Sequence, residues 1–199
     1  MLNFFKKIFA TPEKPSSEEP DFDLNSTIVD TTIIDKEDPD TRFARLYNET
    51  GGKFLYAENA DDIRMFLQEI VAENTGKNVW CVCSKLKELL SASNIPFTAV
   101  PDAEAQINFI TCEYLIAFNG SILISSDQTD HRKIHEISNT YIILAYPDQI
   151  VDNIQEGLRN IKRLKSNNLP TNITTIKGST KEGLSPNAKN IYLILTERP

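Results

Sequence analysis

The sequence contains little cysteine. Cys81, Cys83 and Cys112 are its three cysteines, and their number and spacing exclude a disulfide framework and a four-thiolate zinc or iron-sulfur site. Cys81 and Cys83 lie two residues apart in "NVWCVC", which is typical of a buried strand, so both side chains are expected on the same face. We interpret the cysteines as small buried hydrophobic residues in a reducing compartment. The alternative is a thiol that lines a pocket.

Long apolar runs are also absent. No stretch approaches the roughly 20 apolar residues of a membrane-spanning helix, and the first residues lack the hydrophobic core and cleavage site of a secretory signal. We therefore expect a cytoplasmic location. The 199 residues, of which 40% are hydrophobic and 25% charged, suffice for one globular domain with a sizeable core and a tail.

Acidic residues outnumber basic ones, and the excess negative charge is concentrated near the N-terminus. The net charge is −7, but residues 11–40 alone carry −8, which leaves the remainder at +1. This remainder has no basic stripe and no base-stacking aromatic motif, so nucleic acid is not an expected partner. The acidic stretch is rich in proline and serine and cannot bury enough apolar surface to fold alone.

These patterns predict three parts of the chain. Residues 1–10 form a short amphipathic segment, residues 11–38 an acidic and flexible linker, and residues 39–199 one α/β domain. The apolar start "MLNFFKKIF" leaves alternatives open. It can pack on this domain or on a partner, and contact with a membrane surface has weaker support because the segment is short and carries two lysines.

From Pro39 onward, helical and strand patterns alternate. Asp38 can cap a helix that starts at Pro39 and stops at Gly51, and Asn59 and Ser84 can cap the next two helices. The strands are expected at "KFLYAE", "NVWCVC", "IPFTAV", "TYIILAY" and "NIYLILTE". This alternation predicts a single α/β domain with a mainly parallel sheet, helices on both faces and one β-hairpin.

A long helix is expected to open at Pro147. Gly157 lies on its apolar stripe, and a glycine there allows a close approach to a neighbouring element. Lys162, Arg163 and Lys165 complement the dipole at the end of this helix, so we assign them no site.

The hairpin is predicted at "CEYLIAFNGSILISSD". Two apolar runs flank Asn119-Gly120, the residues that best tolerate the two positive φ angles of a type I′ turn. We expect this hairpin to add one antiparallel strand to the parallel sheet. The turn chemistry explains both residues, but a glycine turn at a strand end can also let a ligand approach the backbone.

Three segments resemble a known family. "CEYLIAFNGSILISS", "NTYIILAYPDQIVDNIQEGLRNI" and "KNIYLILTE" are similar to the LUD domain of lactate-utilisation proteins, in the LutC/YkgG branch. "GGKFLY" and "PTNITTIK" resemble the compact version of this domain that is common in Bacteroidetes-type bacteria. The resemblance runs from about Gly51 to the C-terminus. It implies a fold similar to the NagB/RpiA/CoA-transferase-like group.

The resemblance also implies a functional context. Members are associated with the oxidation of lactate to pyruvate alongside iron-sulfur partner proteins, which implies an accessory component that binds a small organic anion, an iron-sulfur partner, or both. This chain has no cluster ligands of its own, and no cofactor is expected. The alternative is a non-catalytic interaction protein that kept the fold with a degenerate site.

The chain departs from the family pattern at the hairpin. Typical members read Ala-Glu-Thr-Gly-Thr or Ser where this chain reads Ala117-Phe118-Asn119-Gly120-Ser121. Phe118 thus replaces a glutamate that could act as a base or nucleophile. The resemblance therefore implies no independent catalytic activity, and no catalytic residue is assigned.

The candidate ligand-binding residues are polar side chains at and after the hairpin, together with the segment from Asn172 to Lys177, which we expect to be a loop. Arg132 among them can hold a carboxylate or phosphate, although a solvated basic patch is the alternative. The candidates are Asn119, Gly120, Ser121, Ser126, Arg132, Asn172, Thr174, Thr175 and Lys177. His131 and His135 have helical metal-site spacing, but no third ligand is identifiable and we expect no metal.

Overall fold

A computed structural model of the chain describes residues 37–74, 78–100, 105–178 and 189–198. The predicted segment 1–10 and all but the last residues of the predicted linker 11–38 lie outside these ranges. Within them, no helix has the length and apolar character that crossing a membrane requires.

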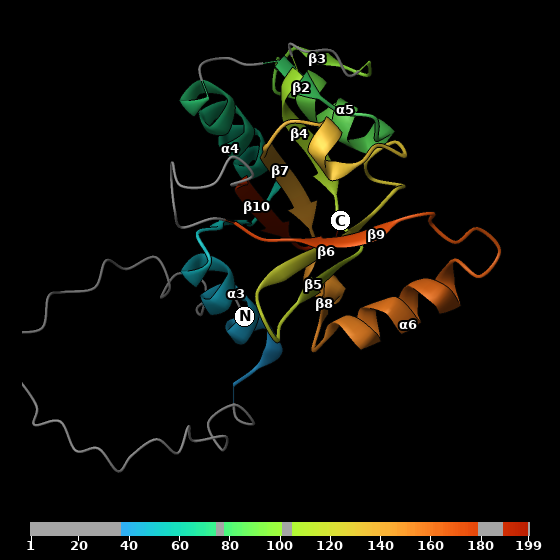
Figure 1. Cartoon of the computed structure of the whole chain (residues 1–199). Coiled ribbons are helices and arrows are strands. Elements are labelled where there is room, and N and C mark those ends of the chain that lie inside the picture. Colours follow the sequence, from blue (N-terminus) through green and yellow to red (C-terminus); the bar gives the residue numbers. More distant parts are fainter. Residues whose placement is uncertain (1–36, 75–77, 101–104, 179–188, 199) are drawn as a thin grey trace, which may run out of the picture. The chain divides into compact units, whose positions relative to one another are not determined.

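A six-stranded parallel sheet forms the centre of the domain (Figure 1). All neighbouring strands run parallel, as the alternation of elements predicts. In spatial order the strands are β1 (Lys53–Ala57), β10 (Asn190–Thr196), β7 (Thr140–Ala145), β4 (Ala105–Thr111), β2 (Asn78–Trp80) and β3 (Phe97–Thr98). The central strand β4 was not among the predicted strands.

Helices cover both faces of this sheet, which confirms the predicted fold class. Helices α4 (Ala60–Glu73) and α5 (Ser84–Ala92) share an apolar core with one face, in which Leu67 and Leu90 are fully buried. Helix α3 (Pro39–Glu49) lies on the other face. There the Tyr47 hydroxyl donates a hydrogen bond of 3.1 Å to the Ile191 carbonyl, and the Tyr47 ring packs edge-on against Phe54.

The hairpin belongs to a second sheet, so its predicted insertion into the parallel sheet is wrong. This four-stranded sheet has the order β8 (Ile150–Val151), β5 (Tyr114–Ile116), β6 (Ser121–Ser125) and β9 (Ile173–Ile176). Helix α6 (Ile154–Leu164) covers one of its faces (Figure 1). A Cβ at Gly157 would lie 3.1 Å from Leu123 Cδ2, which confirms the predicted close approach.

Helix α3 begins at Pro39 directly after Asp38, as predicted, although the Asp38 side chain makes no capping hydrogen bond. Two other predicted helix starts need correction. The cap of α5 is Cys83, not Ser84. Pro147 opens only the short 3₁₀ helix η2 (Pro147–Gln149), and α6 begins after Asn153, whose side chain accepts a hydrogen bond from the Glu156 amide. A second 3₁₀ helix, η1 (Ile134–Glu136), precedes β7.

The hairpin turn also differs from the predicted type I′. Ile116 pairs with Ser121, so the loop comprises residues 117–120, and only Gly120 in it has a positive φ, +65°. A Cβ at Gly120 would lie 2.6 Å from the backbone of Leu46 and Tyr47. The glycine is therefore required because the loop packs directly on the backbone of α3.

Candidate functional site

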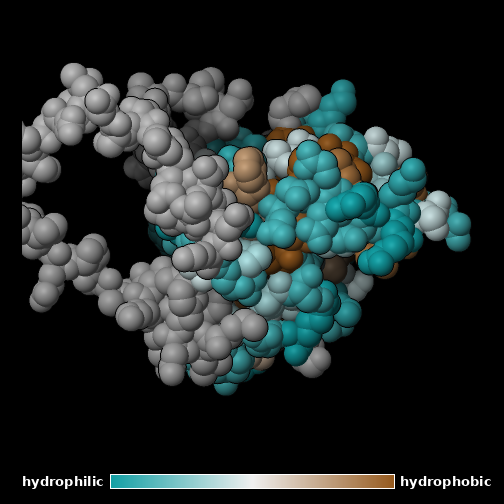
Figure 2. Space-filling view, turned by 90° about the horizontal axis from the view of Figure 1, so that it is seen from below, coloured by the Kyte–Doolittle hydropathy of each residue, from teal (hydrophilic) through white to brown (hydrophobic). Residues whose placement is uncertain are grey.

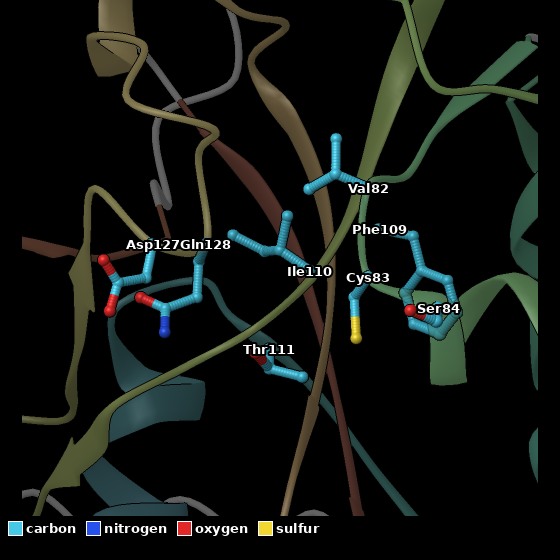
Figure 3. Close-up of a pocket in the computed structure, with 8 residues that line it drawn as sticks. All are labelled: Val82, Cys83, Ser84, Phe109, Ile110, Thr111, Asp127 and Gln128. Carbon is cyan, nitrogen blue, oxygen red and sulfur yellow. The ribbon is translucent and has the colours of Figure 1, made fainter.

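A pocket lies at the carboxyl ends of strands β2 and β4 (Figure 3). From β2 the chain continues into α5, which packs on one face of the parallel sheet, whereas from β4 it passes into β5 of the small sheet, which has a core cluster of its own. Such divergence at the carboxyl ends is where ligands bind in open α/β sheets. The pocket has a volume of about 320 Å³ and is lined by Val82, Cys83, Ser84, Phe109, Ile110, Thr111, Asp127 and Gln128.

The amino-terminal end of α5 forms part of this pocket. Ser84 is the first residue of the nine-residue helix, and the preceding Cys83 makes no side-chain capping hydrogen bond. A helix N-terminus carries a partial positive charge and backbone N–H groups that its own helix does not use. This end of the pocket therefore favours a negatively charged group.

The cysteines divide between core and pocket. Cys81 and Cys112 are buried, which confirms their prediction as core residues. Burial raises the pKa of the Cys81 thiol to about 11 and raises the pKa of Cys112 as well, so both stay protonated at neutral pH. Cys83 is only partly buried and lines the pocket. It fits the alternative of a thiol in a pocket.

A hydrogen-bonded network supports the opposite wall of the pocket. One carboxylate oxygen of Glu113 accepts hydrogen bonds from Lys165 Nζ at 2.6 Å, Ser125 Oγ at 2.6 Å and Gln128 Nε2 at 2.9 Å. Lys165 Nζ also lies 2.7 Å from Asp127 Oδ2. Asp127 and Gln128, which line the pocket, are thus fixed by groups behind them.

The charges of this network do not cancel. The Glu113 side chain is only 8% exposed, and the ammonium of Lys165 lies between it and the Asp127 carboxylate. Burial would lower the pKa of Lys165, but the hydrogen bonds that its ammonium donates to Asp127 and Glu113 raise the pKa above its ordinary value. Two carboxylates and one ammonium give the network a net charge of −1. This wall therefore favours a ligand group that donates a hydrogen bond.

The nine predicted binding residues do not lie in one place. Asn119, Gly120 and Ser121 form the hairpin tip, where Asn119 Oδ1 accepts hydrogen bonds from the Ser121 amide and hydroxyl. Lys177 also lies near the tip, because it follows Ile176, the partner of Ile122.

The other predicted residues lie farther along β6. The Ser126 hydroxyl accepts a hydrogen bond from the Thr171 amide, and the Ser126 amide bonds to the Asn172 carbonyl. Arg132 follows in the same turn region. The two groups are separated by the length of β6, about 17 Å. The structure thus does not place the predicted residues at one shallow site, and the ligand-binding role of each group stays a prediction.

The segment from Asn172 to Lys177 is mostly a strand, which corrects its prediction as a loop. Thr174 and Thr175 lie in β9 and pair with Ile124 and Leu123 of β6. Strand β9 is an edge strand of the small sheet, and this position explains part of the polar character of the two threonines.

The histidine pair does not have the helical geometry that its spacing suggested. His131 lies in a turn with φ +60°, and η1 begins only at Ile134. Among the described residues, no group of three potential metal ligands comes together.

The sequence reasoning did not select the polar residues of this wall as binding candidates. Glu113 follows the end of β4 by two residues, and Asp127 and Gln128 follow the end of β6 by two and three residues. Their position at strand ends was a usable signal. Lys165 was assigned only to the helix dipole, although its ammonium joins both carboxylates.

Comparisons with known proteins agree with this architecture. A crystal structure described as a DUF162 family protein from Deinococcus radiodurans superposes with a TM-score of 0.61 at 15% sequence identity, over 79% of this chain and 96% of that chain. At this identity the likeness shows the fold alone. No curated protein matches the chain. Residues 41–195, more than three quarters of the sequence, match the LUD domain. The chain therefore belongs to the LUD domain family, which is associated with lactate utilisation.

Proposed function

We propose that the protein is a cytoplasmic accessory component of lactate or related organic-acid utilisation that binds a small organic anion. The observation that carries this proposal is the polarity of the pocket at the ends of β2 and β4. One end is the uncapped amino-terminus of α5, and the other is the Asp127 and Gln128 wall.

The two ends of the pocket suit different groups of one ligand. A carboxylate is stabilised by the α5 N-terminus and the Ser84 hydroxyl. A hydroxyl group can donate to the Asp127 carboxylate. The volume of about 320 Å³ is at the lower limit of ligand pockets. A short 2-hydroxy acid such as lactate meets all three conditions.

Binding without independent turnover is part of this proposal. Phe118 stands where typical members carry a glutamate, and it lies at the hairpin tip, away from the pocket. An iron-sulfur protein partner would then supply the redox chemistry, because three cysteines are too few to ligate a cluster of the usual four-thiolate kind.

A pair of Ser84 variants tests the proposal. Ser84→Asp places a negative charge where the carboxylate is expected, while an acidic residue in the first turn still stabilises α5. Ser84→Asn is the neutral control of similar size. Lactate at 100 times its Kd should stabilise the wild type and Ser84→Asn by about 2.7 kcal/mol in thermal unfolding, and Ser84→Asp should lose this response.

Two results would contradict this site. Equal stabilisation of Ser84→Asp by lactate would show that the carboxylate does not meet α5. A response that is instead lost in Arg132→Ala or Lys177→Ala would place the ligand among the residues that the sequence first suggested.

The second candidate function is an interaction protein with a degenerate site. It is favoured by Phe118, an apolar side chain that is 71% exposed at the tip of the hairpin. Exposed Ile154, Leu158 and Leu164 on α6 add further apolar surface. The view in Figure 2 shows hydrophobic areas within a mainly hydrophilic surface. This alternative predicts no stabilisation by lactate or pyruvate in the same experiment.

A further inference from the structure

A second and larger pocket lies at the same edge of the parallel sheet. Its volume of about 650 Å³ is twice that of the first pocket. It is formed by residues at the carboxyl ends of β1, β7 and β10, by the first turn of α4 and by one side of α5, and it shares no lining residue with the first pocket. Helix α5 contributes Ser84 to the first pocket and Lys85, Glu88 and Leu89 to the second.

The floor of this pocket is apolar. Ile63 from α4 and Leu144 from β7 are buried core residues that also line it, and the partly buried Leu89 of α5 adjoins them. Thr196 also lines this pocket. Thr196 is 6% exposed, and its hydrogen bond to the Glu197 carbonyl is long, at 3.5 Å. A ligand with an apolar body and a polar end fits such a surface.

The helix terminus in this pocket does not favour an anion. The side chain of Asn59 caps α4 and accepts hydrogen bonds from the amides of Asp61 and Asp62. Both of these residues also place carboxylates in the first turn of the helix. The positive end of the α4 dipole is therefore already compensated, in contrast to the end of α5.

Carboxylates dominate the rim. Glu58, Glu88 and Glu197 line the pocket. Of the two cations in the lining, Arg198 is bound to Asp148 at 2.8 Å and lies over the Tyr146 ring. Lys85 is the remaining cation in the lining, and the carboxylates of Glu88 and Glu197 together outnumber it. The rim thus carries a net negative charge toward a ligand.

We propose that this pocket binds a small organic cation with an apolar body, such as an aryl-alkyl amine. The apolar body covers Ile63, Leu89 and Leu144, and the ammonium lies among Glu58, Glu88 and Glu197. This inference is independent of the anion proposed for the first pocket, because the charge of the ligand and the lining residues both differ.

A pair of ligands with the same ring and opposite charge tests the inference. Isothermal titration of the full chain should give saturable binding of tryptamine with a Kd below about 1 mM and no binding of indole-3-acetate. Glu88→Gln and Glu197→Gln should each weaken tryptamine roughly fivefold, as expected for exposed carboxylates. Ser84→Asp, in the other pocket, should leave tryptamine binding unchanged.

Several outcomes would overturn the inference. They are the absence of saturable tryptamine binding, equal binding of both indoles, and tryptamine binding that is insensitive to both glutamine variants. Because neither glutamate lines the first pocket, the lactate response of both variants should equal that of the wild type. Failure of one site is thereby distinguished from failure of the other.

Discussion

The two ends of the β5–β6 hairpin differ in what surrounds them. At the tip, Gly120 packs on the backbone of α3, and the Phe118 amide donates a hydrogen bond to the Asp152 carbonyl. At the base, Glu113 and Ser125 hold Gln128 against an open pocket. The tip carries the most recognisable sequence, but the base has the space and the polar groups that a ligand requires. The recognisable turn is thus explained by packing, whereas the pocket that we propose as the ligand site lies at the base of the hairpin.

Gly120→Ala, at the tip of the hairpin, should have the largest effect on stability. The substitution forces a Cβ to 2.6 Å from the α3 backbone and places alanine at φ +65°. Strain of this kind and overpacking together should lower the free energy of unfolding by about 3 kcal/mol or more, measured by urea denaturation.

Gly157→Ala, in the helix α6 that packs on the same small sheet, is the matched control. Its Cβ would meet the end of the Leu123 side chain at 3.1 Å, which can move, and alanine recovers about 1 kcal/mol of helix propensity. We expect a change within about 1 kcal/mol. If both variants lost the same stability, the close contact at the tip would not be the cause.

Glu113→Gln, at the base of the hairpin, should have an effect of intermediate size on stability. The change keeps the shape but removes the buried charge that receives hydrogen bonds from Lys165, Ser125 and Gln128. Loss of charge-assisted hydrogen bonds should lower the free energy of unfolding by about 2 kcal/mol. Urea denaturation measures this value.

Asp127→Asn provides the control for this variant. Asp127 contacts the same ammonium but is 34% exposed, so its substitution should cost less than about 1 kcal/mol. A double-mutant cycle with Lys165→Met should give a coupling of about 1 kcal/mol to Glu113. A coupling near zero would show that the network does not stabilise the pocket wall.

The general architecture could be predicted because local signals agreed with it. Apolar runs such as "TYIILAY" and "NIYLILTE" are typical of strands buried on both faces, and they became β7 and β10. Strand β4 was missed, since it carries Asn108, a residue depleted in strands. The structure satisfies this buried amide through the carbonyls of Ser138 and Thr140, a contact 30 or more residues away. The sequence around Asn108 does not contain the residues that make this contact, so it could not predict the strand.

The site was harder to predict for a similar reason. Glu113 and Lys165 are 52 residues apart and meet only because α6 packs on the small sheet. The hairpin was assigned to the parallel sheet, and the sheet to which a strand belongs depends on long-range pairing that turn chemistry does not specify. The position of Asp127 and Gln128 two and three residues after the end of β6 was the one local signal available.

Phe118→Glu should have the smallest effect, and it tests the comparison most directly. It restores the residue type of typical family members at a side chain that is 71% exposed, so the free energy of unfolding should change by less than about 0.5 kcal/mol. Because the length of β6, about 17 Å, separates the tip from the pocket, the Kd for lactate should equal that of Phe118→Ser and of the wild type within about twofold. Titration calorimetry on the three proteins measures this. A larger change confined to the glutamate variant would show that the tip belongs to the ligand site after all, since the serine control removes the same aromatic ring without adding a carboxylate.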